Sequence, residues 1–252
     1  MLGIERRSEI LRLVRRDGSV KVGELSALFE VTEETIRRDI TKLDQEGQVK
    51  KTYGGAVLLD SLSEDVSYVD RERSNIMEKR RIAQLAQQFI DHGDTIFIDA
   101  STTALEMAKA IDRKKEVTII TNSVLAINQL THYENIHVIG IGGTLNPKNL
   151  SMEGPVAIQC IDYYNADKLF FSVKGITKEK GLMDSKEVSV EIKKHMMENS
   201  KQVFLLADTT KFGQSALFGY LPMHHVDALI TDYEMDQSWK AYFEKNEVEI
   251  IS

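Results

Sequence analysis

The fold of the N-terminal part of the chain is decided by residues 20–57, which read VKVGELSALFEVTEETIRRDITKLDQEGQVKKTYGGAV. Apolar residues recur there at the spacing of a helix, first at Val22, Leu25 and Leu28, and then at Ile36, Ile40 and Leu43. Thr32 is placed as the N-cap of the second helix, after a very short turn. Two short amphipathic helices joined this tightly cross steeply, so the stretch predicts a helix-turn-helix, whose second helix enters a DNA major groove.

The outward face of the second predicted helix indicates that DNA is the partner. With the apolar residues turned inward, hydroxyls and cations face outward, where they suit phosphate contacts, and Arg can also bridge guanine edges. Residues 49–53 and the glycines after them predict a short hairpin with a basic rim, a wing. A solvated charged face is the alternative interpretation of the arginines alone, but the cap, the crossing helices and the wing together favour DNA. The predicted DNA-binding residues are Thr32, Thr35, Arg37, Arg38, Thr41, Lys42, Lys50, Lys51 and Tyr53.

The composition is that of a protein with an ordinary core in a reducing compartment. Of the 252 residues, 42% are hydrophobic, and the sequence has neither a long apolar run nor a basic-then-apolar N-terminus. We therefore expect no membrane span and no secretory signal. The one cysteine, Cys160, permits no internal disulfide and fits the cytoplasm, where we expect the protein to reside. We interpret Cys160 as a small core residue rather than a nucleophile.

The net charge of −7 is divided unevenly along the chain. Residues 1–58 carry 11 Lys and Arg against 10 Asp and Glu, while the remainder carries 21 against 29. A near-neutral head on an acidic body argues against sequence-blind coating of nucleic acid, which needs a broadly basic domain. It permits site-specific binding, for which a few cations on one face suffice. The acidic remainder of the chain should therefore have a function other than DNA binding.

The pattern changes twice after the wing. Residues 59–67 are polar, acidic and turn-rich, which predicts an interdomain linker, and a long helix is expected from about Asp70 to Ile90. From Asp94 onward short apolar strands alternate with amphipathic helices, as in a mainly parallel sheet with flanking helices. The expected fold class is therefore α/β. Its expected domains are an N-terminal winged helix-turn-helix domain over 1–58, a linker over 59–70 and a C-terminal, mainly parallel-sheet α/β domain over 71–252.

Small polar or charged residues follow four of the expected strands. The run 99–103 opens directly into a helix, whose free backbone N–H groups and three hydroxyls suit a phosphate. In a parallel sheet such loops meet at the carboxyl ends of the strands, where ligands bind. Each loop alone fits a plain N-cap, but together they favour a small, polar, anionic ligand. The residues of these loops are Asp99, Ser101, Thr102, Thr103, Thr121, Asn122, Gly142, Gly143, Asp208 and Lys211.

Both parts of the chain resemble the DeoR family of bacterial transcription regulators. In the N-terminal part the resemblance rests on Ile10, on TIRRDI at 35–40 and on YGGA at 53–56. In the C-terminal part it rests on Asp99, on the motifs STT at 101–103, TN at 121–122 and GG at 142–143, on Gly154, and on DTTKFG at 208–213. The resemblance implies an effector domain that is similar in fold to ribose-5-phosphate isomerase and binds phosphorylated sugars. It also adds Glu187 to the expected site.

One stretch departs from the family pattern. Where the family often has Phe-x-Gly-x-x-Gly-Ile, residues 170–176 read FFSVKGI, so Ser172 narrows the space that a glycine would leave and Lys174 adds a cation. Lys174 is either a solvated residue at a strand end or a second contact to the phosphate or carboxylate of the ligand. We include it among the expected effector-binding residues.

The residues and the resemblance together predict a DNA-binding transcriptional regulator, a repressor of a sugar or polyol catabolic operon that a phosphorylated sugar releases or modulates. The alternative is a sugar-phosphate isomerase fused to a DNA-binding head, with Asp99, Glu187 and Lys211 as its acid/base and electrostatic groups. We expect no enzyme activity, no cofactor and no metal site, since no ligand spacing surrounds the pair His224-His225 and no Walker A motif occurs. Because one small reading head contacts only a half-site, we expect a homodimer or larger, assembled through the body and the long helix.

Overall fold

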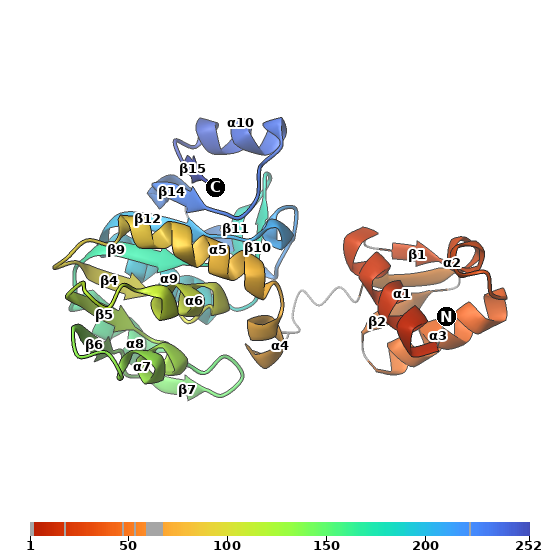
Figure 1. The fold of residues 1–252 in the computed structure, drawn as a ribbon, viewed down its shortest axis with the longest axis horizontal. Coiled ribbons are helices and arrows are strands. Elements are labelled where there is room, and N and C mark those ends of the chain that lie inside the picture. Colours follow the sequence, from red (N-terminus) through yellow and green to blue (C-terminus); the bar gives the residue numbers. More distant parts are fainter. Residues whose placement is uncertain (1–2, 18, 47, 53, 59–67, 222) are drawn as a thin grey trace. The chain divides into compact units, whose positions relative to one another are not determined.

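The chain divides into two compact units, Met1–Ser61 and Leu62–Ser252, in the computed structural model (Figure 1). The structure describes residues 3–17, 19–46, 48–52, 54–58, 68–221 and 223–252. Within these residues, the first unit contains a three-stranded sheet. The second contains a seven-stranded sheet and two smaller ones, of three and two strands.

The first unit is a winged helix-turn-helix. Its elements, in chain order, are α1 (Gly3–Asp17), β1 (Ser19–Lys21), α2 (Val22–Phe29), α3 (Glu33–Gln45), β2 (Val49–Thr52) and β3 (Gly55–Leu58). Strands β2 and β3 form the antiparallel wing, and β3 also pairs with β1. Glu30, the C-cap of α2, has a left-handed backbone with φ 52°, which ends that helix and turns the chain towards α3.

Apolar side chains from the three helices and the wing form the core of this unit. Ile10, Ile36 and Ile40 are at most 1% exposed. Leu28 shares the predicted spacing but is 61% exposed, because a strict three-residue repeat drifts around a helix of 3.6 residues per turn. A side chain at Gly55 would place its Cβ 1.9 Å from the carbonyl oxygen of Val20, so the wing requires a glycine there.

The second unit is built on a parallel sheet. Its strands, in spatial order, are β15 (Glu249–Ile251), β14 (Ala228–Ile230), β12 (Ser200–Leu206), β9 (Ala166–Phe171), β4 (Thr95–Ile98), β5 (Val117–Thr121) and β6 (Ile136–Gly140). Each neighbouring pair in this sheet is parallel. The predicted α/β fold class is confirmed.

Helices cover both faces of this sheet (Figure 1). One face carries α5 (Ile76–Ala86), α6 (Thr102–Ala110) and α7 (Val124–Leu130), and the other carries α8 (Pro155–Asp162), α9 (Glu187–Glu198) and α10 (Gln237–Lys245). In β4, Ile96 and Ile98 belong to the first core and Phe97 to the second. This alternation follows from the two-residue period of a strand, and burial on both faces explains the continuous apolar runs.

The expected long helix from Asp70 to Ile90 is wrong. The structure has α4 (Tyr68–Arg73), then α5, then the short 3₁₀ helix η1 (Gln87–Phe89). The break lies at Ser74 and Asn75, and Asn75 has a left-handed backbone with φ 51°, which asparagine adopts more readily than most residues. Of the expected linker, residues 59–67 lie outside the described residues.

Two small antiparallel sheets follow strands of the large sheet and were not expected from the sequence. The hairpin of β7 (Thr144–Asn146) and β8 (Ser151–Glu153) comes after β6. Strands β10 (Gly175–Thr177), β11 (Gly181–Asp184) and β13 (Phe218–Leu221) form the other sheet. The short helices η2 (Thr209–Lys211) and η3 (Met223–His225) complete the unit.

The chain adds strands in opposite directions on the two sides of the β4–β9 boundary. From β4 it adds β5 and β6 on one side, and from β9 it adds β12, β14 and β15 on the other. The connections that leave the carboxyl ends of β4 and β9 therefore diverge. In open α/β sheets such a switch point opens a crevice where ligands bind, so the topology itself places a candidate site.

Candidate functional site

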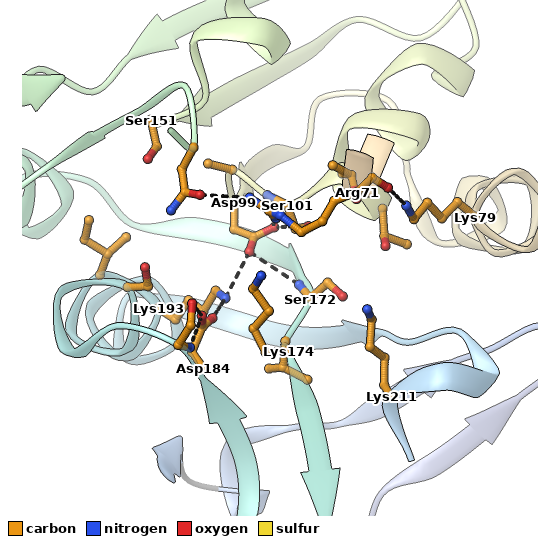
Figure 2. Close-up of a pocket in the computed structure, with 18 of the residues that line it drawn as sticks. Arg71, Lys79, Asp99, Ser101, Ser151, Ser172, Lys174, Asp184, Lys193 and Lys211 are labelled. Atoms are coloured by element: carbon orange, nitrogen blue, oxygen red, sulfur yellow. Dashed lines mark hydrogen bonds and ion pairs between the residues drawn. The ribbon is translucent and has the colours of Figure 1, made fainter. Parts of the chain in front are cut away.

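A polar pocket lies at the switch point, and we call it the strand-end pocket (Figure 2). Connections after β4, β5, β9 and β12 contribute to it, as do α9, the β7–β8 hairpin and the α4–α5 connection. Of the residues that the sequence predicted to bind an effector, the pocket brings together Asp99, Ser101, Thr102, Thr103, Asn122, Lys174, Asp208 and Lys211. It adds Arg71, Ser74, Asn75, Lys79, Asn149, Ser151, Glu153, Ser172, Asp184, Ser185, Ser189 and Lys193, together with three apolar residues.

Asp99 lies at the centre of the pocket wall, directly after β4. It is 2% exposed, and its Oδ1 accepts hydrogen bonds from the backbone N–H of Ser101 at 3.2 Å and from the Ser101 hydroxyl at 2.6 Å. Its Oδ2 accepts one from the backbone N–H of Ser172 at 3.4 Å, which joins the loops after β4 and β9 across the switch point. Burial raises the pKa of the Asp99 carboxyl, although the ammonium of Lys193 and these hydrogen bonds oppose that shift.

Lys193 is the cation that compensates Asp99. Its Nζ lies 3.5 Å from Asp99 Oδ2 and donates to Asp184 Oδ2. Burial alone would lower the pKa of Lys193, but the two carboxylates outweigh it and raise that pKa. All three side chains are nearly inaccessible, so this group is a buried triad of one ammonium and two carboxyl groups.

The start of α6 forms a second part of the pocket. Ser101 is its N-cap, and the Ser101 hydroxyl accepts from the backbone N–H of Ala104 at 3.1 Å while it donates to Asp99. The Ser101 hydroxyl is therefore occupied by capping. Thr102 and Thr103 line the pocket beside it and are 5% and 2% exposed. The positive end of the α6 dipole faces the pocket, which favours an anion.

The loop after β12 supplies an acid and a cation. Asp208 is fully buried and caps η2, with its Oδ1 accepting from the backbone N–H of Thr210 at 3.0 Å. Asp208 Oδ2 lies 3.8 Å from Lys211 Nζ, and it is a buried oxygen without a hydrogen-bond partner among the described residues. Lys211 is half-buried and Lys174, after β9, points into the same pocket (Figure 2).

The α4–α5 connection forms the wall that sequence reasoning missed. Lys79, in the first turn of α5, is 2% exposed, and its Nζ donates to the backbone carbonyls of Arg71 and Ser74. Asn75 donates from Nδ2 to Asp208 Oδ1 at 3.4 Å and to Thr210 Oγ1 at 3.3 Å. A usable signal existed for Lys79, because it stands at helical spacing from the buried Ile82 on the apolar face of its helix.

The β7–β8 hairpin closes another side of the pocket. Asn149, in its turn, accepts from Arg71 Nη2 at 2.8 Å, and Glu153 accepts from the Ser151 hydroxyl at 2.9 Å. Asn122 donates from Nδ2 to the carbonyl of Met152 at 3.0 Å, which fixes the orientation of its amide. Its Oδ1 is buried and has no hydrogen-bond partner among the described residues. The pocket thus holds unused acceptors as well as cations.

Four predicted residues do not line the pocket. Thr121 is fully buried, and its hydroxyl accepts from the backbone N–H of Ser123 at 3.1 Å. Gly142 and Gly143 are exposed, and a Cβ at Gly143 would lie 2.7 Å from the carbonyl oxygen of Glu153, so this glycine serves the packing of the hairpin. Glu187 is exposed at the first residue of α9.

Helix α3 carries five of the predicted DNA-binding residues, all at least partly exposed: Thr35, Arg37, Arg38, Thr41 and Lys42. Thr32 caps the helix by accepting from the backbone N–H of Thr35 at 3.3 Å. Arg37 pairs with Glu33 at 2.8 Å, one turn earlier, with both side chains about half exposed. Arg38 and Lys42 are exposed on the same helix, and among the described residues neither has an ion pair.

The wing lies beside α3 and is joined to it by two hydrogen bonds. Lys51 donates from Nζ to the hydroxyl of Thr41 at 2.8 Å and from its backbone N–H to Asp44 Oδ1 at 2.8 Å. Lys50 lies on β2, the same strand. Tyr53 lies outside the described residues.

A buried ion pair fixes α3 inside its unit. Asp39 is 5% exposed, and its carboxylate accepts from Arg6 Nε at 2.6 Å and lies 3.4 Å from Arg7 Nη1. The sequence motif therefore divides its charges between two tasks. Asp39 holds α1 against α3, while Arg37 and Arg38 remain on the surface.

The described residues contain no group of His, Cys, Asp or Glu side chains that could hold a metal ion. None of the described helices combines the length and the apolar content that a bilayer span requires. Cys160 is partly buried against the core, and His224 and His225 contact each other edge to face.

Known proteins match both units. Residues 6–62 match the DeoR-like helix-turn-helix domain, and residues 74–233 match the DeoR C terminal sensor domain. The uncharacterized HTH-type transcriptional regulator YulB of Bacillus subtilis strain 168 is 40% identical over 252 residues, covering 100% of this chain and 97% of its own length. The HTH-type transcriptional repressor GlcR of the same organism is 31% identical over 247 residues, covering 98% of this chain and 95% of its own.

One solved structure adds a similarity of fold. The translation initiation factor eIF-2B of Pyrococcus horikoshii OT3 matches with a TM-score of 0.52 and 18% identity, covering 90% of this chain and 95% of that one. At this identity the likeness concerns the fold alone. The family matches go further: the chain belongs to the DeoR family and is a DNA-binding transcriptional regulator rather than an isomerase.

Proposed function

We propose that this DeoR-family regulator represses an operon for the breakdown of a sugar or polyol, and that a phosphorylated sugar bound in the strand-end pocket releases or modulates it. The observation that carries this proposal is the pocket itself, where the N-terminus of α6 meets Lys211 and Lys174 at the switch point of the sheet. A helix N-terminus and nearby ammonium groups together favour a phosphate. The relative GlcR is named a transcriptional repressor, which supports repression rather than activation as the proposed role of this chain.

The acceptors of the pocket support a polyol attached to that phosphate. Asn122 Oδ1 and Asp208 Oδ2 are buried without a hydrogen-bond partner among the described residues. Leaving a buried acceptor unmet costs about 1–3 kcal/mol, so a ligand that brings hydroxyl donors gains affinity there. A phosphate at the cations and hydroxyls at these acceptors would satisfy both kinds of group with one molecule.

The DNA-binding surface that we propose is the exposed face of α3 with the wing beside it. Arg38 and Lys42 are exposed without ion pairs among the described residues, so their donors are available to phosphates or base edges. Thr41 and Lys51 are held together by a hydrogen bond, which positions the wing relative to the helix. The proposed contact residues are Thr32, Thr35, Arg37, Arg38, Thr41, Lys42, Lys50, Lys51 and Tyr53.

We further propose that the protein acts as a homodimer or a larger assembly. One winged helix-turn-helix reads a half-site, and specificity within a genome usually takes two. Because the expected long helix is broken at Asn75, the assembly is assigned to the α/β unit rather than to a helical pair. Light scattering on residues 68–252 should give the same multiple of the chain mass as the full-length protein, and a monomer would contradict this assignment.

The experiment that tests the ligand is calorimetric titration with a panel of pentose and hexose phosphates, beside the same sugars without phosphate. We expect at least one phosphate to bind and its unphosphorylated sugar not to bind. We also expect the bound sugar phosphate to be recovered unchanged, because a sensor that consumed its ligand would erase the signal. If the whole panel fails to bind, or if the phosphate makes no difference to affinity, the proposed ligand class is wrong.

A further inference from the structure

Lys79 carries a buried ammonium group to which the proposed function assigns no role. It lines the strand-end pocket, and its Nζ donates to two backbone carbonyls, those of Arg71 and Ser74. Among the described residues, no carboxylate lies within ion-pair distance of it, in contrast to Lys193, which has two. An ammonium carries three donors, so at least one remains for a ligand. A buried ammonium that donates to carbonyl oxygens and has no carboxylate within ion-pair distance among the described residues is an unfavourable arrangement that an anion would relieve.

The electrostatic surroundings of Lys79 point to the same missing anion. Burial and the neighbouring cation of Lys211 lower the pKa of Lys79 to about 8. Arg71, from α4, acts in the same direction, while Asp208, after β12, and Glu106, on α6, oppose it. Two ammonium groups that repel each other across a pocket wall form a site for a dianion, because its charge favours the protonated form of both.

The two carbonyls that hold Lys79 lie at the end of α4 and in the α4–α5 connection. Arg71 lies in the last turn of α4, and Ser74 lies in the connection itself. The connection then passes through the left-handed Asn75, whose amide is tied to Asp208 and Thr210. Its conformation therefore depends on contacts with pocket residues. If Lys79 turned to a ligand, the Ser74 carbonyl would lose this donor and the Arg71 carbonyl would keep the Ser74 hydroxyl, which donates to it at 3.1 Å, so the hydrogen bonding of the connection would change.

We propose that Lys79, together with Lys211, binds the phosphate of the effector, and that Lys79 transmits occupancy of the pocket by exchanging its carbonyl partners in the α4–α5 connection for phosphate oxygens. This inference rests on the proposed function. Its consequence is regulatory, because α4 is the first described element after residues 59–67, which follow the wing in the chain. A ligand can bias DNA binding only through an element whose conformation differs between the bound and free states, and we assign that role to the α4–α5 connection.

The first test is the affinity of the panel's tightest-binding sugar phosphate for Lys79→Met, with Lys201→Met as the matched control. Lys201 is an exposed lysine at the opposite end of the sheet, in the first residues of β12. Loss of a charge-assisted bond should weaken binding by about 10- to 100-fold in Lys79→Met, while Lys201→Met should bind like wild type. Equal affinity of the two variants would overturn the assignment.

A second test uses wild-type protein and does not depend on the variant folding. A sugar phosphate is a dianion above about pH 7, so its own charge is constant from pH 7.5 to pH 9.5. As the pH rises through about 8, free Lys79 loses its proton, and the affinity should fall by up to about tenfold per pH unit. Calorimetry in two buffers of different ionisation enthalpy should show proton uptake on binding near pH 8. An affinity independent of pH, with no proton uptake, would contradict the proposal.

The regulatory half is tested by amide hydrogen exchange over residues 68–79. Saturating sugar phosphate should change exchange at the α4–α5 connection in wild type and in Lys201→Met, and the change should be lost in Lys79→Met at ligand concentrations that saturate it. Unchanged exchange in wild type would refute the transmission. The two proposals fail separately: if the panel does not bind at all, the proposed function fails, whereas binding that needs Lys211 and not Lys79 refutes this inference alone.

Discussion

The α3 surface and the strand-end pocket both gather cations, but they hold them in different ways. On α3 the cations are exposed, and the ion pair of Arg37 with Glu33 is open to water. In the pocket, Lys79 and Lys193 are at most 8% exposed, and each is held by oxygen atoms of the protein. Exposed charges cost little to place and little to remove, whereas buried ones must be compensated. We interpret the α3 surface as suited to a polyanion such as DNA and the strand-end pocket as suited to a small, enclosed anion.

The largest expected effect is on stability, from breaking the buried triad. Lys193→Met leaves the carboxylates of Asp99 and Asp184 buried beside each other without a cation, which should cost about 3–5 kcal/mol of unfolding free energy. The loss should shrink at low pH, because protonating the two carboxyls removes their repulsion. Urea unfolding followed by circular dichroism measures both effects. Lys201→Met is the control. Equal urea midpoints for Lys193→Met and Lys201→Met would show that the buried lysine contributes no more to stability than the exposed one.

The next effect is on ligand binding. Lys211 is half-buried and lies 3.8 Å from Asp208, and truncating its side chain leaves the triad of Lys193, Asp99 and Asp184 intact. Lys211→Ala should weaken the bound sugar phosphate by about 10- to 100-fold, as loss of a charge-assisted bond does. Calorimetry on a variant with unchanged circular dichroism measures this. Retained affinity would place the phosphate away from the β12 loop.

An effect of comparable size is expected on the α3 surface. Arg38→Ala should remove about 1–3 kcal/mol of specific DNA affinity if the side chain reads a base. If it contacts a phosphate alone, binding should weaken for all sequences alike and the salt dependence should become flatter. Titrations of operator and random DNA at several salt concentrations separate the two cases. A folded Arg38→Ala/Lys42→Ala variant with wild-type affinity would refute the assignment of α3 as the recognition helix.

The smallest effect is on the exposed ion pair of α3. Arg37→Ala removes the partner of Glu33, and because both side chains are about half exposed, the unfolding free energy should fall by less than about 1 kcal/mol. Asp39→Ala provides the contrast within the same unit, since it leaves Arg6 and Arg7 without their buried carboxylate. In thermal unfolding, the melting temperature of Asp39→Ala should lie well below that of Arg37→Ala. The reverse order would show that the buried ion pair does not contribute more to stability than the exposed one.

The sequence predicted the α/β class, the winged head and the loops that meet at the switch point, because each depends on local spacing. It did not predict the residues that long-range packing brings to the pocket, such as Arg71 and Asn149, which are 78 positions apart in the chain. The break at Asn75 was also missed, since residues 70–75 are all polar and the left-handed backbone leaves no periodic trace.

Charged residues on apolar helix faces were the signal that sequence reasoning left unused. Asp39, Lys79 and Lys193 each stand at inward positions beside buried aliphatic neighbours. Helical periodicity alone places these three charges in the interior, and a buried charge requires a partner. Two of the three line the strand-end pocket, and the third joins α3 to α1. An ionisable residue on an inward face is therefore a better indicator of a site than a charge run on an outward one.

We propose that occupancy of the strand-end pocket changes DNA binding by the winged head. The direct measurement is operator affinity with and without the sugar phosphate that binds, in wild type and in Lys211→Ala. We predict equal operator affinity for the two proteins without ligand, a shift in wild type when ligand is added, and no shift in Lys211→Ala at the same ligand concentration. A Lys211→Ala protein that responds to the ligand as wild type does would contradict the account.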